Sequence, residues 1–394
     1  MTVTANFSFP TAIRFGAGRA AELAQACREA GIERPLFVTD PGLAAMAMVK
    51  GILADLERAK LTVGLFGEVR PNPVEQNVAD GVAAFKKGDH DGVIAFGGGS
   101  GLDVGKLVAF MQGQTRSIFD FEDIGDWWTR ADASSIAPIV AVPTTAGTGS
   151  EVGRAGVVTH PGTHEKKIIY HPKMMPRFAI LDPALTVGLP AKLTAATGMD
   201  ALAHCLEAYC APAYHPLAQG VAIEGLRLVK DNLSVAVHNP HDLDARGNML
   251  MASSMGATAF QRGLGAIHAL SHPFGGLYDA HHGLLNGIIM PYVLQANRPR
   301  IEADIDRAAR YLDIDGGFDG FVGWVLRLRE EIAIPHALHE IGIDDRRLDE
   351  VAAMAVKDPT AGSNPIAFTV AQYKALAGKC VGGDLGEASK LPSS

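Results

Sequence analysis

The chain has 394 residues, of which 47% are hydrophobic and 20% are charged, and its formal net charge at pH 7 is −8. This length and ordinary composition predict two globular domains, each large enough to bury a core of its own. The acidic balance argues against nucleic acid or an anionic membrane as the main partner, because both attract basic surfaces.

The sequence shows no sign of export or of membrane insertion. Its first residues do not join a basic segment to an apolar one, and no apolar run approaches about 18 residues. The four cysteines, Cys27, Cys205, Cys210 and Cys380, are scattered without CxxC spacing, which is typical of reduced thiols. We therefore expect a cytoplasmic protein.

The first half of the chain alternates short apolar runs with amphipathic segments. Helices are predicted at Arg19–Ala30 and between the RPNP turn and Lys87. Alternating strands and helices predict an α/β dinucleotide-binding domain with a doubly wound, mostly parallel, Rossmann-like sheet. The predicted strands lie within Phe7–Gly18, Arg34–Asp40, Leu61–Phe66, Gly92–Phe96, Ala137–Val152 and Phe178–Pro183.

A Gly-rich turn, GGGSGLDVGK at Gly97–Lys106, follows one of these strands directly. Glycines let backbone N–H groups approach an anion, and the positive end of the next helix faces the same point, so pyrophosphate is a natural ligand. The turn lacks GxGxxG spacing, and Ser100 and Leu107 break the Walker A pattern. The pattern leaves Lys106 open as a solvated helix residue.

Two other strand ends carry polar residues. Asp40 stands where many dinucleotide folds bind the adenosine ribose, although strands also end in Asp to form turns. The strand within Ala137–Val152 is followed by hydroxyl residues and by what we predict to be a helix start. Thr144, Thr145 and Ser150 are candidate donors to ribose or phosphate, and the alternative is a loop built from ST-turns.

After Leu189 helical periodicity replaces the strand pattern, so an all-α second domain is predicted, with the α/β domain at 1–184 and the helical domain at 185–394. The predicted helices are Ala191–Tyr209, Pro216–Val237, Asp242–Phe260, Ala266–Phe274, Leu284–Ala296, Ile301–Leu312, Phe318–Glu330, Asp344–Val356 and Thr369–Leu376.

The helical half carries a cluster of metal-ligand residue types. Asp200 and His204 are four residues apart and lie on one face of a helix, and His268, His272, His281 and His282 follow close together. One carboxylate and two or three imidazoles suit a divalent metal such as Fe²⁺ or Zn²⁺, with a position left for substrate. An Asp–His pair alone is more often a simple hydrogen-bonded pair.

The segments GMDALAHCLEAY and HALSHPFGGLYDAHHG resemble the signature regions of the iron-containing (group III) alcohol dehydrogenase family. The resemblance implies that Asp200, His204, His268 and His282 hold the metal. It places His272 beside substrate and nicotinamide, as a catalytic residue that relays the proton, and leaves His281 incidental.

GGGSGLDVGK and PTTAGTGSE resemble the cofactor motifs of the same family, so the resemblance spans nearly the whole chain. It implies that Asp40 favours NAD over NADP, because a carboxylate repels a 2′-phosphate, and that Asp103 and Lys166 lie near the nicotinamide with catalytic roles. The cofactor-binding residues that it implies are Asp40, Asn72, Gly98, Gly99, Ser100, Asp103, Thr144, Thr145, Thr148, Ser150 and Lys166.

The predicted function is a metal-dependent NAD(H) alcohol dehydrogenase that interconverts an alcohol and its aldehyde or ketone by hydride transfer, at a site between the two domains. The expected cofactors are NAD and Fe²⁺, with Zn²⁺ or another divalent metal as alternatives. The resemblance also implies a homodimer or higher homo-oligomer, without nucleic-acid or membrane partners.

Several alternatives stay open. A glycerol-dehydrogenase-like polyol dehydrogenase uses three protein ligands, a maleylacetate reductase lacks the metal set, and a dehydroquinate-synthase relative carries Glu at the first ligand position. A P-loop nucleotide-binding protein is disfavoured by the failed Walker pattern. The substrate is open too: Ala259 and Thr360 differ from relatives, and Arg154 and Arg262 are candidates to bind an anionic substrate or to form surface ion pairs.

Overall fold

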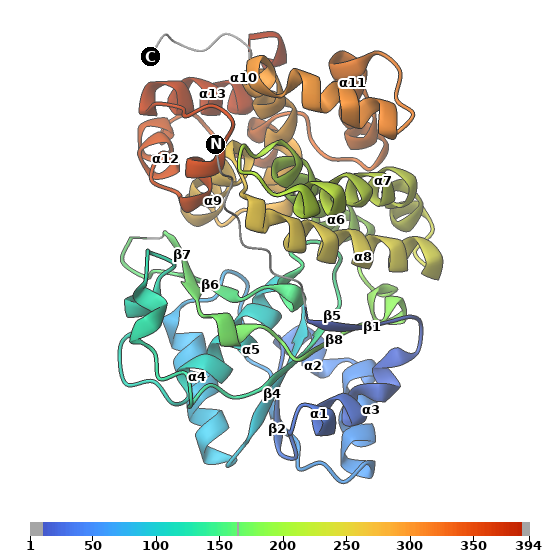
Figure 1. The fold of residues 1–394 in the computed structure, drawn as a ribbon, viewed down its shortest axis with the longest axis vertical. Helices are drawn as coiled ribbons and strands as arrows, with labels where there is room; N and C mark the ends of the chain where they lie inside the picture. Colours follow the sequence, from blue (N-terminus) through green and yellow to red (C-terminus); the bar gives the residue numbers. More distant parts are fainter. Residues whose placement is uncertain (1–10, 164, 388–394) are drawn as a thin grey trace. The chain divides into compact units, whose positions relative to one another are not determined.

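Residues 11–163 and 165–387 are described in the computed structural model (Figure 1). Over these described residues the chain divides into two compact units, one that ends at Leu189 and one that begins at Pro190. This division coincides with the change in sequence pattern after Leu189 and falls a few residues beyond the domain bounds at 184 and 185, because the short turn Pro183–Thr186 belongs with the first unit. Within the described ranges no helix combines the length and the apolar character needed to cross a bilayer.

The first unit is built on a six-stranded sheet in which every neighbouring pair of strands is parallel. The order β1-β8-β5-β4-β2-β3 confirms the predicted doubly wound sheet. Its strands are β1 (Ala12–Phe15), β2 (Pro35–Val38), β3 (Gly64–Phe66), β4 (Gly92–Gly97), β5 (Ile139–Pro143) and β8 (Phe178–Leu181).

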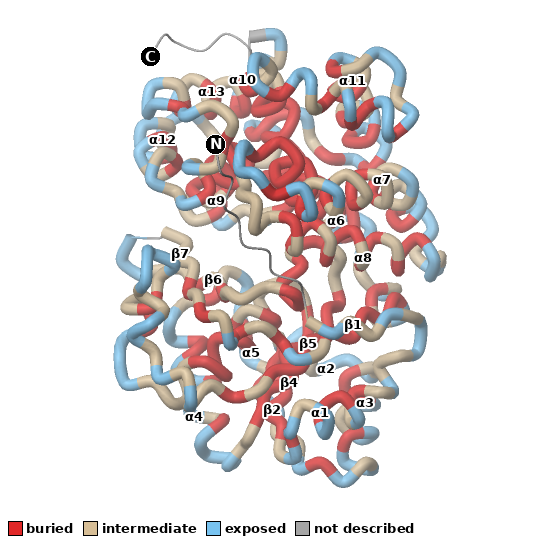
Figure 2. The backbone as a smooth tube through the Cα atoms, in the orientation of Figure 1, coloured by how far each residue is buried: buried red, intermediate tan, exposed pale blue. Residues whose placement is uncertain are grey.

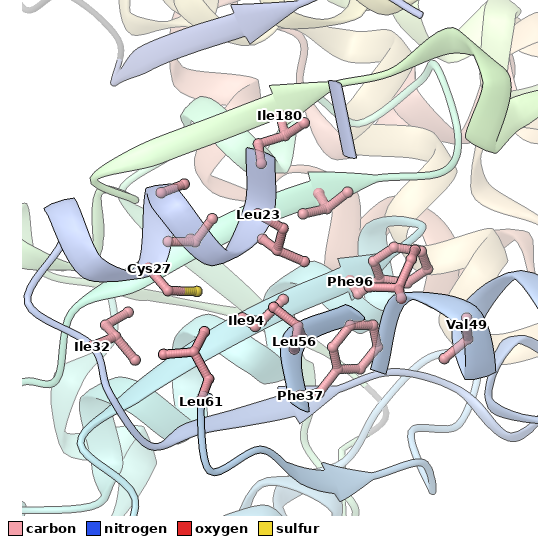
Figure 3. Close-up of a cluster of buried hydrophobic side chains, with 14 residues drawn as sticks. Leu23, Cys27, Ile32, Phe37, Val49, Leu56, Leu61, Ile94, Phe96 and Ile180 are labelled. Carbon is pink, nitrogen blue, oxygen red and sulfur yellow. The ribbon is translucent and has the colours of Figure 1, made fainter. Parts of the chain in front are cut away.

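Helices cover both faces of this sheet (Figure 1). Alternate strand residues point to opposite faces, so Phe37 and Ile94 pack in one cluster, shown in Figure 3, while Leu36 and Val93 pack in the other. The first cluster contains side chains of α1 (Leu23–Glu29) and α3 (Ala47–Arg58), and the second those of α4 (Glu75–Lys87) and α5 (Gly99–Met111). The short helix α2 (Pro41–Ala45) follows β2.

The segment after β5 departs from the prediction. The helix expected to start near Ser150 is only a single turn, Ser150–Val152, and the chain then forms an antiparallel hairpin of β6 (Ala155–Thr159) and β7 (Lys166–Tyr170). The predicted helix start is therefore wrong. Gly149 in the left-handed region (φ 61°) precedes the turn, and the β-branched residues that follow favour strands.

The second unit is all-α, as predicted, but one predicted break is absent. Leu284–Ala296 and Ile301–Leu312 were expected to be separate helices, whereas α10 runs unbroken through Pro291 and Pro299. Packing against α6, α9 and α11 holds α10 together in spite of both prolines. The helices are α6 (Ala191–Cys210), α7 (Pro216–His238), α8 (Leu243–Ala259), α9 (Ala266–Tyr278), α10 (His282–Tyr311), α11 (Gly317–Glu331), α12 (Leu348–Ala355) and α13 (Val370–Gly382).

Two helices of this unit are buried nearly all round. Figure 2 shows that α6 and the first half of α10 lie inside the unit, and nearly every residue from Thr194 to Cys210 is buried. Polar side chains on such helices are costly unless they find partners. The polar groups of α6 and α10 therefore mark a site.

Candidate active site

One face of α6 presents three acidic or imidazole side chains. Asp200, His204 and Glu207 follow one another at spacings of four and three residues, so they line up along the helix. Each is at most 7% exposed. A buried row of this kind needs positive charge or hydrogen-bond donors from the neighbouring helices.

Helices α9 and α10 bring two histidines to that row. Asp200 Oδ1 lies 3.9 Å from His204 Nε2, 3.8 Å from His268 Nε2 and 3.5 Å from His282 Nε2. Single ligand atoms of Asp200, His204 and His268 all lie within 4.8 Å of one another. The structure thus brings together the four residues predicted as metal ligands, three of them in the tightest group.

Asn286 shows that these atoms converge on one point. Its Nδ2 lies 2.7 Å from Asp200 Oδ1, 3.3 Å from His268 Nε2 and 3.2 Å from His282 Nε2. Its Oδ1 is buried without a hydrogen-bond partner among the described residues. Three lone-pair atoms aimed at one place, beside an unpartnered amide oxygen, fit a divalent cation with one carboxylate and imidazole ligands.

The electrostatics of the site point the same way. Burial by itself raises the pKa of the Asp200 carboxyl, but three neighbouring imidazoles outweigh it and hold that pKa well below its usual range. Burial lowers the pKa of His268, whereas the carboxylates of Glu207 and Asp200 raise it, to a net value of about 9. Two buried carboxylates therefore stabilise positive charge at this point.

The imidazoles are held by further partners. His268 Nδ1 lies 2.6 Å from Glu207 Oε2. Ser271 Oγ donates to the carbonyl of His268 at 3.2 Å and lies 3.2 Å from His282 Nδ1. With Nδ1 so engaged, Nε2 is the ring atom of His268 and of His282 that faces the convergence point.

His272, the predicted proton relay, is paired with an acid from a distant segment. Its Nδ1 lies 2.7 Å from Asp358 Oδ2, and its ring stacks on that of His282 with centroids 5.2 Å apart. Asp358 Oδ1 accepts from the N–H of Thr360 at 2.9 Å and from its hydroxyl at 2.6 Å. Because Nδ1 is paired with Asp358, Nε2 is the nitrogen of His272 that can contact a substrate.

In the first unit, the predicted cofactor residues follow the carboxyl ends of adjacent parallel strands. Asp40 follows β2, the GGGS turn follows β4, and the PTTAGTGSE loop follows β5. The N–H of Thr144 donates to the carbonyl of Gly97 at 2.9 Å and joins the two loops. Open α/β sheets bind ligands at this edge.

The two loops pack closely at their glycines, and at Gly99 they leave no room for a side chain. A Cβ on Gly99 would lie 2.6 Å from Thr148 Cγ2, and one on Gly98 would lie 3.3 Å from Thr145 Cγ2. Helix α5 has Gly98 as its N-cap and no side-chain cap, so its first N–H groups face outward at the positive end of the dipole. This cradle fits a pyrophosphate.

Asp103 and Ser150, both predicted to contact the cofactor, form a hydrogen bond with each other. Asp103 Oδ1 accepts from the Ser150 hydroxyl, and its Oδ2 accepts from the N–H of Val157 at 3.1 Å. Lys106 lies 3.4 Å from Asp103 Oδ1 and donates to the carbonyls of Ser150, at 2.9 Å, and Ala155. Lys106 is 1% exposed, so the solvated reading of this lysine is wrong.

The other predicted cofactor residues lie at less closed positions. Asp40 caps α2, accepting from the N–H of Leu43 at 2.9 Å. Asn72, at a positive φ of 47°, lies in the turn between β3 and α4, and Lys166 is the first residue of β7; both are half-buried. Their roles toward a cofactor remain predictions.

The two arginines considered for substrate binding both have contacts within the protein. One donates hydrogen bonds to backbone carbonyls, and the other stacks on an aromatic ring. Arg262 donates to the carbonyls of Ala213, Ala208 and Tyr209, just beyond and within the end of α6, so it is neither a surface ion pair nor a free cation. Arg154 lies over the ring of Tyr170 with its guanidinium carbon 5.6 Å from the centroid.

Four residues of the site were missed by sequence reasoning: Glu207, Ser271, Asn286 and Asp358. Glu207 and Asn286 carried a signal, because they fall one helical turn after His204 and His282 on faces already assigned to the site. Asp358 carried none, because 86 residues separate it from His272.

A doubly wound unit with a glycine cradle and a helical unit with one carboxylate and several imidazoles are together typical of a metal-dependent dehydrogenase. Residues 10–183 match the family described as iron-containing alcohol dehydrogenase, and residues 194–381 match its C-terminal domain. The chain belongs to this family. It is an oxidoreductase that interconverts alcohols and aldehydes with a nicotinamide cofactor.

Individual relatives are similar over almost the full length. The 4-hydroxybutyrate dehydrogenase of Cupriavidus necator is 37% identical over 377 residues, covering 93% of this chain and 97% of the relative. A structure of 1,3-propanediol oxidoreductase has a TM-score of 0.88 at 34% identity, covering 95% of this chain and 99% of that one. Sulfoacetaldehyde reductase from Bifidobacterium kashiwanohense, in complex with NAD+, has a TM-score of 0.87 at 27% identity, covering 97% and 100%.

Proposed function

We propose that Asp200, His204, His268 and His282 are the ligands of a divalent cation in this dehydrogenase. The proposed metal is Fe²⁺. The observation that carries the proposal is the approach of three imidazole Nε2 atoms to Asp200 Oδ1, at 3.5 to 3.9 Å, in a buried site. When bound, a divalent cation acts as a Lewis acid that lowers the pKa of the substrate hydroxyl and polarises the aldehyde carbonyl.

The proton leaves through His272. Asp358 accepts from Nδ1 and keeps the hydrogen there, so Nε2 is the atom that takes the hydroxyl proton during oxidation and returns it during reduction. The hydride passes from the alcohol carbon to the nicotinamide, which is thereby reduced. Asp103 and Lys166 act near the nicotinamide in this proposal, and Asp103 also holds Ser150 in place.

The cofactor is NAD rather than NADP. Gly98, Gly99 and Ser100 bind the pyrophosphate with backbone N–H groups at the start of α5, which has no side-chain cap. Asp40, at the end of β2, bonds the ribose hydroxyls and repels a 2′-phosphate. Asn72, Thr144, Thr145, Thr148, Ser150 and Lys166 complete the contacts.

The substrate is a short primary alcohol with a second polar group at its far end. Two of the relatives are named for 4-hydroxybutyrate and 1,3-propanediol, which share this chemistry. Comparing kcat/KM for 1,3-propanediol, 4-hydroxybutyrate and unsubstituted 1-butanol tests the proposal, and a clear preference for 1-butanol contradicts it.

We also infer a cytoplasmic homo-oligomer, a dimer in the simplest case. The four cysteines are free and buried, which suits a reducing compartment. Light scattering on the purified protein measures the assembly, and a monomeric mass contradicts the inference.

The metal assignment is tested with His268→Ala. We expect this variant to lose bound metal and turnover while it still binds NADH, because the glycine cradle belongs to the other unit. Metal analysis and NADH fluorescence measure both. His282→Ala separates four protein ligands from three: a variant that keeps metal at full affinity removes His282 from the ligand set.

A further inference from the structure

Glu207 is a buried carboxylate with both oxygens engaged at the start of α9. Its Oε1 accepts from the N–H of Ile267 at 2.7 Å, and its Oε2 lies 2.6 Å from His268 Nδ1. It comes from α6, the helix that also carries Asp200 and His204. One side chain therefore links the two helices that supply three of the proposed ligands.

Helix α9 has no cap of its own. Its N-cap is Gly265, and its first N–H groups are served from other segments, Ala266 by Asn364 Oδ1 at 3.0 Å and Ile267 by Glu207. A Cβ on residue 265 would lie 2.8 Å from Asn364 Oδ1 and 2.9 Å from Glu207 Oε1. Glycine at this position lets both oxygens reach the helix end.

Capping alone does not explain a charged side chain here. Asn364 caps the neighbouring N–H with a neutral amide, whereas a buried carboxylate costs several kcal/mol unless it is paired. In the described part of the chain no Lys or Arg forms an ion pair with Glu207. Its partner is the ring nitrogen of His268, and its charge acts through that ring.

We propose that Glu207 is a positioning residue of the metal centre, which holds the His268 hydrogen on Nδ1 and so turns the Nε2 lone pair toward Asp200. The inference rests on the proposed function, because it takes His268 as a ligand. A carboxylate behind a ligating imidazole makes the ring a stronger ligand and fixes its orientation. Glu207 touches neither substrate nor cofactor in this account.

Glu207→Gln tests the proposal without changing the size of the side chain. The amide oxygen still accepts from Ile267, but the amide NH₂ faces Nδ1 and moves the ring hydrogen to Nε2. The metal-free full-length variant is titrated with Zn²⁺ against a chromophoric chelator. We expect its Kd to rise about ten- to hundredfold, and the visible absorption bands of the Co²⁺-loaded protein to shift.

Asn364→Ala is the matched control, because it removes the other cap of α9 without reaching His268. It is expected to lower Tm and to leave the Zn²⁺ Kd and the Co²⁺ bands unchanged. A wild-type Zn²⁺ Kd in Glu207→Gln overturns the proposal. An equal loss of Zn²⁺ affinity in Asn364→Ala also overturns it, since the role of Glu207 is then only structural.

Two further variants keep the outcomes separate. Should Glu207→Gln not fold, Glu207→Asp retains the charge but is too short to serve both partners; it is expected to weaken Zn²⁺ binding, and an unchanged Kd overturns the inference. His268→Ala tests the function beneath it. Wild-type Zn²⁺ binding in His268→Ala removes the ligand assignment itself, whereas loss there beside an unaltered Glu207→Gln overturns the role of Glu207 alone.

Discussion

The two units differ in the kinds of residue that form their candidate sites. In the helical unit the candidate metal centre consists of one carboxylate and several imidazole side chains from α6, α9 and α10 that converge in a buried space. In the α/β unit the candidate nucleotide site consists of glycines and small hydroxyl residues in two loops. The metal centre depends on the ligand atoms of its side chains. The nucleotide site depends in large part on glycines, because their lack of a Cβ lets the two loops pack closely.

Each unit also contains a buried charged side chain that positions other groups of its candidate site. Glu207 acts on the imidazole of His268, whereas Lys106 acts on the backbone carbonyls of Ser150 and Ala155. The difference follows from the parts that have to be held: a ligand ring needs a fixed orientation, and a loop that binds through its N–H groups needs a fixed path.

The largest effect is expected from adding a side chain to the cradle. In Gly99→Val the new Cβ would lie 2.6 Å from Thr148 Cγ2, so the two loops are forced apart and backbone N–H bonds to the pyrophosphate are lost. We expect the NADH Kd to rise at least about a hundredfold, measured by NADH fluorescence, with Zn²⁺ binding unchanged. Gly51→Ala, in open space on α3, is the control. Equal NADH binding in both variants contradicts the cradle.

Removing the buried charge of the α/β unit comes next. Lys106→Met leaves Asp103 without its cation and removes the ammonium donor from the carbonyls of Ser150 and Ala155, so the free energy of unfolding should fall by about 3–5 kcal/mol. Denaturant titration measures the change. Lys87→Met, an exposed lysine of the same unit, is expected to stay within about 0.5 kcal/mol of wild type. Similar values for the two lysines would show that burial of Lys106 contributes nothing.

In the helical unit the matching change is Asp358→Asn. The amide NH₂ would face His272 Nδ1 and reverse the tautomer, so kcat should fall by about a hundredfold or more while bound metal is retained. Thr360→Val removes a hydroxyl that donates to Asp358 but keeps the carboxylate, and a smaller loss is expected. An unaltered kcat and pH profile in Asp358→Asn would exclude His272 as the relay.

A pH titration of the metal-free protein sharpens the view of the helical site. The pKa of His268 is raised from 6.5 to about 9 in the folded state, by Glu207 and Asp200 against the effect of burial. Its protonation therefore stabilises the fold fully below pH 6.5, and this contribution is lost as the pH rises through about 9. Zn²⁺ must displace that proton, so affinity should rise across the same window by up to about tenfold per pH unit. A Zn²⁺ affinity that does not change with pH over this window contradicts the raised pKa of His268.

The smallest effect is expected at the cofactor ribose. Asp40→Asn keeps the cap of α2, because Asn caps as well as Asp, but removes the charge. The ratio of kcat/KM for NADP to that for NAD should increase about tenfold with Tm unchanged. If this ratio does not change, residues other than Asp40 determine the preference for NAD over NADP.

The sequence anticipated those parts of the site that are local. Helical spacing put Asp200 and His204 on one face, and glycines after a buried strand predicted the cradle, because both patterns depend on backbone geometry over a few residues. The family motifs then supplied His268 and His282. The unbroken α10 escaped prediction, because packing overrode the signal of its two prolines.

Tertiary packing decided what the remaining charged groups do. Lys106 looked like a possible surface residue because its partners belong to the turn at Ser150 and to the hairpin that follows, where the local pattern predicted only a helix start. Asp358 reaches His272 across 86 residues. The second oxygen of Glu207 meets the ring of His268 only once α6 and α9 are packed together. Spacing along the chain determines which side chains share a face. Whether a buried charge meets a metal ligand, a backbone carbonyl or another acid depends on which faces the fold brings into contact, because a buried charge is stabilised only by groups within a few ångströms.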